Sequence, residues 1–161
     1  MFLLVEDDDD HAMLIERAMR RVPEQLTITR VADGEAALKF LRREPPYEDS
    51  RRPDVILLDL NLPKYSGHEV LRAAKSDERL AEIPVVVLTT SDADIDRSQA
   101  YQNRVNSFLV KPVDFEQFRT LVADLSRYWG HWNEPSTGAE NAATKAGNSA
   151  QDGDAAPGTS P

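Results

Sequence analysis

Short apolar runs that end in a polar residue recur along the chain. They are Phe2–Val5, Val55–Leu58, Val85–Leu88 and Phe108–Val110. Each is rich in leucine or β-branched side chains, which is typical of strands buried on both faces of a parallel sheet. The carboxyl ends of such strands meet at one edge, where α/β proteins bind ligands. That edge is expected to gather the polar residues that follow or end the runs, which are Glu6, Asp7, Asp59, Thr89 and Lys111.

Segments with helical periodicity lie between the apolar runs. The first follows Asp8 or Asp9, either of which can cap the exposed helix amides, and Pro23 ends it. A short alternating strand is predicted over residues 26–31, and a second helix begins near Gly34. The apolar faces of these two helices consist of Leu14, Ile15, Ala18, Met19 and Val22, and of Ala36, Ala37, Phe40 and Leu41.

The second half of the chain continues this alternation. Residues 42–53 hold a Pro-Pro pair and seven charges, as expected for an exposed loop. Three more helices are predicted: one around residues 70–74, one over 92–103 with a thin apolar face and expected mobility, and one capped by Asp114. The last has the longest apolar stripe, formed by Phe115, Phe118, Leu121, Val122, Leu125, Tyr128 and Trp129. Five strands alternating with five helices predict a doubly wound parallel α/β sheet.

Residues 133–161 contain no large apolar side chain and are dominated by Gly, Ala, Ser, Thr, Asn and Pro. Such a segment cannot offset the entropy of ordering, about 1–2 kcal/mol per residue for the backbone. We therefore expect one domain over residues 1–132 and a disordered tail over 133–161.

Composition narrows the classes of partner and chemistry. The net charge of −9 disfavours nucleic acid and anionic membranes as direct partners. The absence of cysteine excludes disulfides and thiol catalysis. The apolar start is too short for a signal peptide or a membrane span, so a soluble cytoplasmic protein is expected.

The acidic residues at the predicted sheet edge favour a bound cation. Two carboxylates about 4 Å apart repel by about 4 kcal/mol at an effective dielectric constant near 20. A divalent cation would relieve this repulsion between Glu6, Asp7 and Asp59. Mg²⁺ suits a site with few carboxylates next to a phosphate, because it keeps several of its waters.

Asp59 is then a candidate nucleophile. A carboxylate can attack a phosphoryl group to form an aspartyl phosphate, whose added charge needs compensation. Lys111 offers a flexible ammonium for one phosphate oxygen, and Thr89 offers a hydroxyl for another. Either residue alone is common at a surface or strand edge, so the combination carries the hypothesis.

The motifs LLVED (3–7), ILLDLNLP (56–63) with Gly67, PVVVLTTS (84–91) and FLVKP (108–112) together resemble the receiver domains of two-component response regulators. The resemblance implies a flavodoxin-like strand order 2-1-3-4-5 and phosphorylation of Asp59 by a histidine kinase. It also implies Mg²⁺ held by Glu6, Asp7, Asp59 and the main-chain carbonyl of Asn61, with Thr89 and Lys111 on the phosphoryl group.

The same resemblance implies a switch in which Thr89 moves toward the phosphate and the aromatic side chain of Phe108 turns inward. Phe108 lacks the hydroxyl that a tyrosine has at this position in many relatives. The Lys111–Pro112 bond is often cis in relatives. Asn61 and Ser91 would flank the water that attacks the phosphoryl group, and so set the lifetime of the phosphorylated form.

More narrowly, the long loop before Asp54 and the ending YWGHW resemble small stand-alone regulators that serve bacterial phytochrome-type histidine kinases. Trp129 and Trp132 would cover the domain's own core or a second subunit, so a homodimer is among the expected assemblies. The output would be a surface change recognised by a downstream protein that the sequence does not identify.

Three alternatives remain at this point. An aspartyl-phosphate phosphatase would have Asp-x-Asp after its first strand, whereas Asn61 stands two residues after Asp59. A nucleotide or flavin binder would need a glycine-rich first loop, which Asp7 to Asp10 replace. A receiver-like adaptor that is never phosphorylated is the main alternative. The favoured function is not that of an enzyme, beyond self-phosphorylation and autodephosphorylation.

Overall fold

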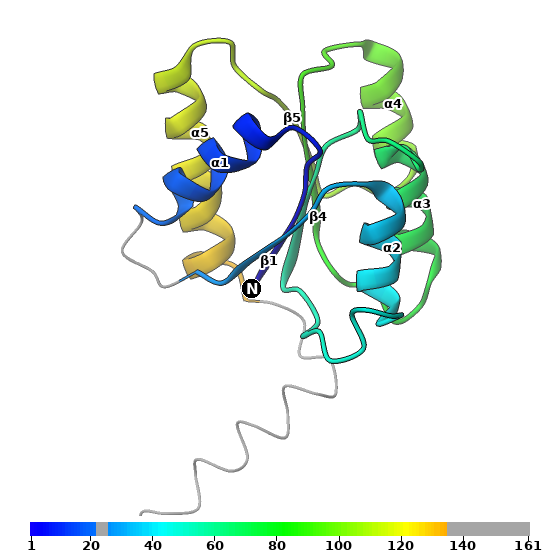
Figure 1. Ribbon diagram of the computed structural model, residues 1–161. Helices are drawn as coiled ribbons and strands as arrows, with labels where there is room; N and C mark the ends of the chain where they lie inside the picture. Colours follow the sequence, from blue (N-terminus) through cyan, green and yellow to red (C-terminus); the bar gives the residue numbers. More distant parts are fainter. Residues whose placement is uncertain (22–25, 135–161) are drawn as a thin grey trace, which may run out of the picture.

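Five parallel strands form one sheet with helices on both sides (Figure 1). The computed structural model describes residues 1–21 and 26–134. The spatial order is β2-β1-β3-β4-β5, and every neighbouring pair is parallel. The predicted α/β fold and strand order are therefore confirmed. The strands are β1 (Phe2–Val5), β2 (Ile28–Val31), β3 (Val55–Leu58), β4 (Val85–Thr89) and β5 (Ser107–Val110).

Two helical layers cover the sheet. In Figure 1, α1 and α5 lie on one side of the sheet, and α2, α3 and α4 lie on the other. Each layer encloses a hydrophobic cluster, one around Ile15 and Val122 and the other around Leu41 and Leu71. The helices are α1 (Asp9–Met19), α2 (Gly34–Arg42), α3 (Gly67–Ser76), α4 (Asp94–Gln102) and α5 (Phe115–Arg127), and a π-helical turn, η1 (Tyr128–Trp132), continues α5.

Side-chain caps begin four of these helices. Each cap accepts a hydrogen bond from an amide that has no partner within the helix. Helix α4 differs, because it begins after Ala93 without a side-chain cap and buries only Ala100. The thin apolar face predicted for this helix is confirmed, while its mobility stays a prediction. The capping residues are Asp8, Asp33, Ser66 and Asp114.

The prediction that all four apolar runs are buried on both faces is wrong for β5. Strands β1, β3 and β4 are fully buried, but β5 is half-buried and Val110 is exposed. The cause is the strand order, which places β5 at the edge of the sheet. The predicted strand over 26–31 is shorter than expected, since β2 begins at Ile28.

The predicted stripe of the last helix is buried only in its middle. Phe118, Val122 and Leu125 are buried, whereas Phe115 and Tyr128 are exposed. A helix of this length spans about 20 Å, while four-residue strands span about 13 Å, so its ends extend beyond the sheet. Trp129 is partly buried and packs against the hydrophobic cluster between the sheet and helices α1 and α5, so it covers the domain's own core. Trp132 is exposed, so its role in a dimer stays a prediction.

Some predictions concern residues outside the described ranges. They are the contribution of Val22 to the first helix, its end at Pro23, and the disordered tail beyond Glu134. The loop over 42–53 lies within the described ranges and is mostly exposed, as predicted. Within residues 1–21 and 26–134, no helix has the length and apolar character needed to span a bilayer.

Candidate functional site

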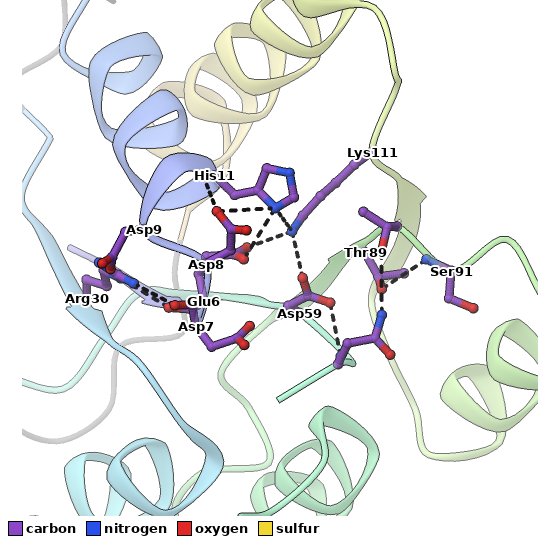
Figure 2. A network of polar contacts seen from close by, with 12 residues as sticks. Glu6, Asp7, Asp8, Asp9, His11, Arg30, Asp59, Thr89, Ser91 and Lys111 are labelled. Carbon is purple, nitrogen blue, oxygen red and sulfur yellow. Dashed lines mark hydrogen bonds and ion pairs between the residues drawn. The ribbon is translucent and has the colours of Figure 1, made fainter. Parts of the chain in front are cut away.

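Lys111 lies between two buried carboxylates at the carboxyl edge of the sheet. Its Nζ donates to Asp59 Oδ2 at 2.6 Å and to Glu6 Oε2 at 2.7 Å. The side chains of Lys111 and Glu6 are 3% and 2% exposed, respectively. Figure 2 shows the three side chains converging from separate strand ends. The structure thus brings together three of the residues that the sequence singled out.

The strand register produces this convergence. Backbone pairing continues one residue past β1 and β3, where the Glu6 amide donates to Val31 O and the Asp59 amide donates to Val5 O. The Lys111 amide likewise donates to Thr89 O at 2.7 Å. Parallel strands with matched ends therefore present their next side chains to one small volume.

Glu6 and Asp59 together bring more negative charge into the site than the single ammonium of Lys111 offsets. Burial raises the pKa of Glu6 above its ordinary 4.5, although the Lys111 ammonium opposes this shift. Its Oε1 is buried and has no hydrogen-bond partner. Two buried carboxylates share one ammonium, and one carboxylate oxygen accepts no hydrogen bond. This donor set of hard oxygens fits a divalent cation of the Mg²⁺ type.

Asp59 is held by both of its oxygens. Oδ2 accepts from Lys111, and Oδ1 accepts from the main-chain amide of Asn61 at 3.1 Å. The turn after β3 closes where the Gly67 amide donates to Leu60 O. A Cβ on Gly67 would stand 2.1 Å from the Asp59 carbonyl oxygen, so the chain passes here only with glycine.

Thr89 stands at the end of β4 and is fully buried. Its Oγ1 accepts from the Ser91 amide at 3.3 Å. The Ser91 hydroxyl donates to Asp96 on α4, and Asp96 also contacts His68 on α3 at 3.3 Å. The Thr89 side chain is therefore linked to the β4–α4 loop and through it to two helices, whereas the Lys111 ammonium contacts Glu6 and Asp59.

Asp7 lies apart from the Lys111 cluster. Its side chain is exposed, and Figure 2 draws its carboxylate away from the Lys111 ammonium. Its main-chain carbonyl accepts from Arg30 Nη2 at 3.2 Å. The three acids expected to hold a metal are therefore not gathered around one point, and that ligand set stays a prediction.

Sequence reasoning missed two residues at this site, Arg30 and His11. Arg30 lies on β2, and its role depends on the pairing of β2 with β1. His11 Nδ1 lies 3.4 Å from Lys111 Nζ and 3.6 Å from Glu6 Oε1. The only local signal for His11 was its position three residues after the cap Asp8, whose Oδ1 accepts from the His11 amide.

The peptide bond before Pro112 differs from the expectation drawn from relatives. Within the described residues the only cis bond joins Pro45 to Pro46, so the bond from Lys111 to Pro112 is trans. Lys111 nevertheless points at Asp59, because β5 pairing fixes its backbone. Phe108 is partly buried and packs against the cluster under α2, α3 and α4.

Comparison with known proteins identifies the family. The sequence profile of the response regulator receiver domain matches residues 2–123. The chain belongs to the response regulator receiver domain family. Membership accounts for the parallel sheet in the order β2-β1-β3-β4-β5. It confirms the resemblance seen in the four sequence motifs.

Relatives of similar length share much of the sequence. The probable methanogenesis regulatory protein FilR2 of Methanothrix harundinacea is 50% identical over 135 residues, which cover 83% of this chain and 85% of that protein. Response regulator Rcp1 of Synechocystis sp. is 40% identical over 131 residues, which cover 80% of this chain and 88% of Rcp1. The match therefore spans most of each relative.

Solved structures agree with the fold. The crystal structure of the phosphorylated cyanobacterial phytochrome response regulator RcpA superposes with a TM-score of 0.82 at 38% identity, covering 84% of this chain and 97% of RcpA. The Mn²⁺-bound form of Rcp1 superposes with a TM-score of 0.82 at 36% identity, covering 84% of this chain and 98% of that structure. The narrower resemblance to phytochrome response regulators is thus confirmed as a similarity.

Proposed function

We propose that this chain is a signalling receiver that accepts a phosphoryl group on Asp59 from a histidine kinase. The observation that carries the proposal is the buried Asp59 carboxylate, held on one oxygen by Asn61 and on the other by Lys111. A carboxylate oxygen attacks phosphorus, and the bond from phosphorus to the donor nitrogen of the kinase histidine breaks. The chemistry of the receiver itself is limited to self-phosphorylation and autodephosphorylation.

Mg²⁺ is the proposed cofactor. Glu6, Asp7, Asp59 and the main-chain carbonyl of Asn61 would hold it, and the cation would supply positive charge against the incoming phosphoryl oxygens. Support comes from the buried Glu6 oxygen that accepts no hydrogen bond and from the two carboxylates that share a single ammonium. For Glu6 and Asp7 to act together, the Asp7 side chain must turn toward the cluster.

Lys111 and Thr89 bind the product. Lys111 already contacts Asp59, so a small shift of its ammonium pairs it with a phosphoryl oxygen. The Thr89 oxygen accepts from Ser91, which leaves the hydroxyl hydrogen to donate to another phosphoryl oxygen. Movement of Thr89 would break the Ser91 contact and displace the β4–α4 loop, and Phe108 would fill the space behind it.

Asn61 and Ser91 are proposed to set the lifetime of the phosphorylated form, because they flank the path of the attacking water. A phytochrome-type histidine kinase is the proposed phosphodonor in the cytoplasm, on the strength of the similarity to RcpA. The changed surface would be recognised by a downstream protein or by a second copy of the chain.

Incubation with Mg²⁺ and acetyl phosphate, followed by mass spectrometry of the intact protein, tests the proposal. The wild type should gain one phosphoryl group and Asp59→Asn none. Asp49→Asn, in the exposed loop, is the control and should behave as the wild type. A wild type that gains no phosphoryl group would instead support the adaptor that is never phosphorylated. Equal labelling of the Asp59 variant would place the acceptor elsewhere.

A further inference from the structure

Arg30 contacts the loop between β1 and α1 through all three nitrogens of its guanidinium. Nε donates to Glu6 O at 3.1 Å, and Nη2 donates to Asp7 O at 3.2 Å. Nη1 lies 2.7 Å from Asp9 Oδ1 at the start of α1. Figure 2 shows these contacts on the side of the loop away from Lys111. One guanidinium thus joins both ends of the acidic loop.

We propose that Arg30 is a positioning residue that holds this loop in the geometry required for cation binding. The inference rests on the proposed function, since it takes Glu6 and Asp7 as cation ligands. Arg30 would touch neither the cation nor the phosphoryl group. It acts through its hydrogen bonds to the main-chain carbonyls of Glu6 and Asp7. These bonds fix the backbone of the two ligand residues, and so the positions from which their side chains extend.

Geometry and charge predict opposite effects of removing Arg30. A lone positive charge near the site would repel a cation, so its loss would tighten binding. Removing Arg30 also leaves the Asp9 carboxylate unpaired, but the Asp9 side chain is 89% exposed, so water and salt screen this charge effect. Loss of the two bonds to carbonyls instead frees the backbone, and the entropy of ordering it then opposes cation binding.

Lysine separates these two effects. It keeps the positive charge but lacks the planar fork that reaches Glu6 O, Asp7 O and Asp9 together. If geometry matters, Arg30→Lys and Arg30→Met should both weaken cation binding. Two hydrogen bonds from a charged donor support an expected loss of roughly tenfold in affinity.

The experiment uses the full chain and Mn²⁺ as the probe, with free Mn²⁺ measured by electron paramagnetic resonance. The wild type, Arg30→Lys and Arg30→Met are titrated without a phosphodonor. Arg20→Met is the control, because it removes an exposed arginine at the end of α1 that pairs with Glu16 of that helix. Thermal unfolding in EDTA is measured for each variant, since a merely structural role would lower stability without changing the dissociation constant of the folded protein.

The expected result is weaker binding in both Arg30 variants and wild-type binding in Arg20→Met. Wild-type affinity in Arg30→Lys, or tighter binding in Arg30→Met, would overturn the inference while leaving the cation site in place. A wild type that binds no Mn²⁺ would overturn the proposed cation site and this role together. Phosphorylation of Asp59, tested separately by mass spectrometry, distinguishes that outcome from failure of the phosphoacceptor proposal.

Discussion

Replacing Lys111 with Met removes the one ammonium between Glu6 and Asp59 while keeping an aliphatic side chain of similar length. The two contacts measure 2.6 and 2.7 Å, and the lysine side chain is 3% exposed. At an effective dielectric constant of about 20, each contact attracts by about 6 kcal/mol. Desolvation of the three charges offsets much of this attraction.

The loss of one partner from a buried ion pair typically costs about 3–5 kcal/mol, because it leaves uncompensated charge in the interior. We expect Lys111→Met to lower the free energy of unfolding by that amount at pH 7 without divalent cations. This is a large share of the roughly 5–15 kcal/mol that stabilises a typical domain. Added Mg²⁺ should restore part of the loss if the acidic site binds the cation.

The effect should also depend on pH. Burial raises the pKa of Glu6, and Lys111 opposes that shift, so removing Lys111 should raise this pKa further. A carboxyl group with a raised pKa binds its proton more tightly in the folded state. Stability of the variant should therefore increase from pH 7 to pH 5, and the gap to the wild type should shrink.

Urea unfolding followed by circular dichroism measures these free energies. Lys64→Met is a matched control, since Lys64 also contacts two carboxylates, Asp33 at 2.8 Å and Glu35 at 3.1 Å, but is 56% exposed. Water and salt screen exposed pairs, so this variant should lose far less stability. A loss below about 1 kcal/mol for Lys111→Met at pH 7 would refute the argument from buried charge.

Three further predictions concern the loops around the site. Gly67→Ala should unfold at a lower temperature and accept less phosphate from acetyl phosphate, because the added Cβ would stand 2.1 Å from the Asp59 carbonyl oxygen. A variant that matches the wild type in both assays would contradict this. Ala93→Ser should supply the missing cap of α4 and raise stability by about 0.5–2 kcal/mol in urea unfolding, whereas no gain would show that this helix start cannot use a cap. The bond from Lys64, followed by that from the Ala36 amide, lowers the pKa of Asp33 below 3.8. The stabilisation from the ionised Asp33 should be complete above its unfolded-state pKa and lost as the pH falls through its lower folded-state pKa. In urea unfolding, the stability difference between wild type and Asp33→Asn should therefore be constant from pH 7 to 5 and shrink below about 4.

Much of the site was predictable because each member follows or ends its own apolar run. Glu6, Asp59, Thr89 and Lys111 were found without knowing which strands are neighbours, since all parallel strands end at the same edge. The sequence could not show that Lys111 contacts the two acids while Thr89 contacts Ser91. Side-chain direction depends on packing around each strand end, which local periodicity does not encode.

The sequence by itself determined the alternation of strands and helices, a cap for the first and for the last helix, and most of the polar residues of the site, because these depend on residues close together in the chain. The strand order followed from the family resemblance, but only the tertiary structure showed that the edge position leaves β5 half-exposed. The tertiary structure also decided the contact between Glu6 and Lys111, which are 105 residues apart, and the hydrogen bonds from Arg30 to the acidic loop. Such contacts arise only when the sheet order brings distant strand ends together.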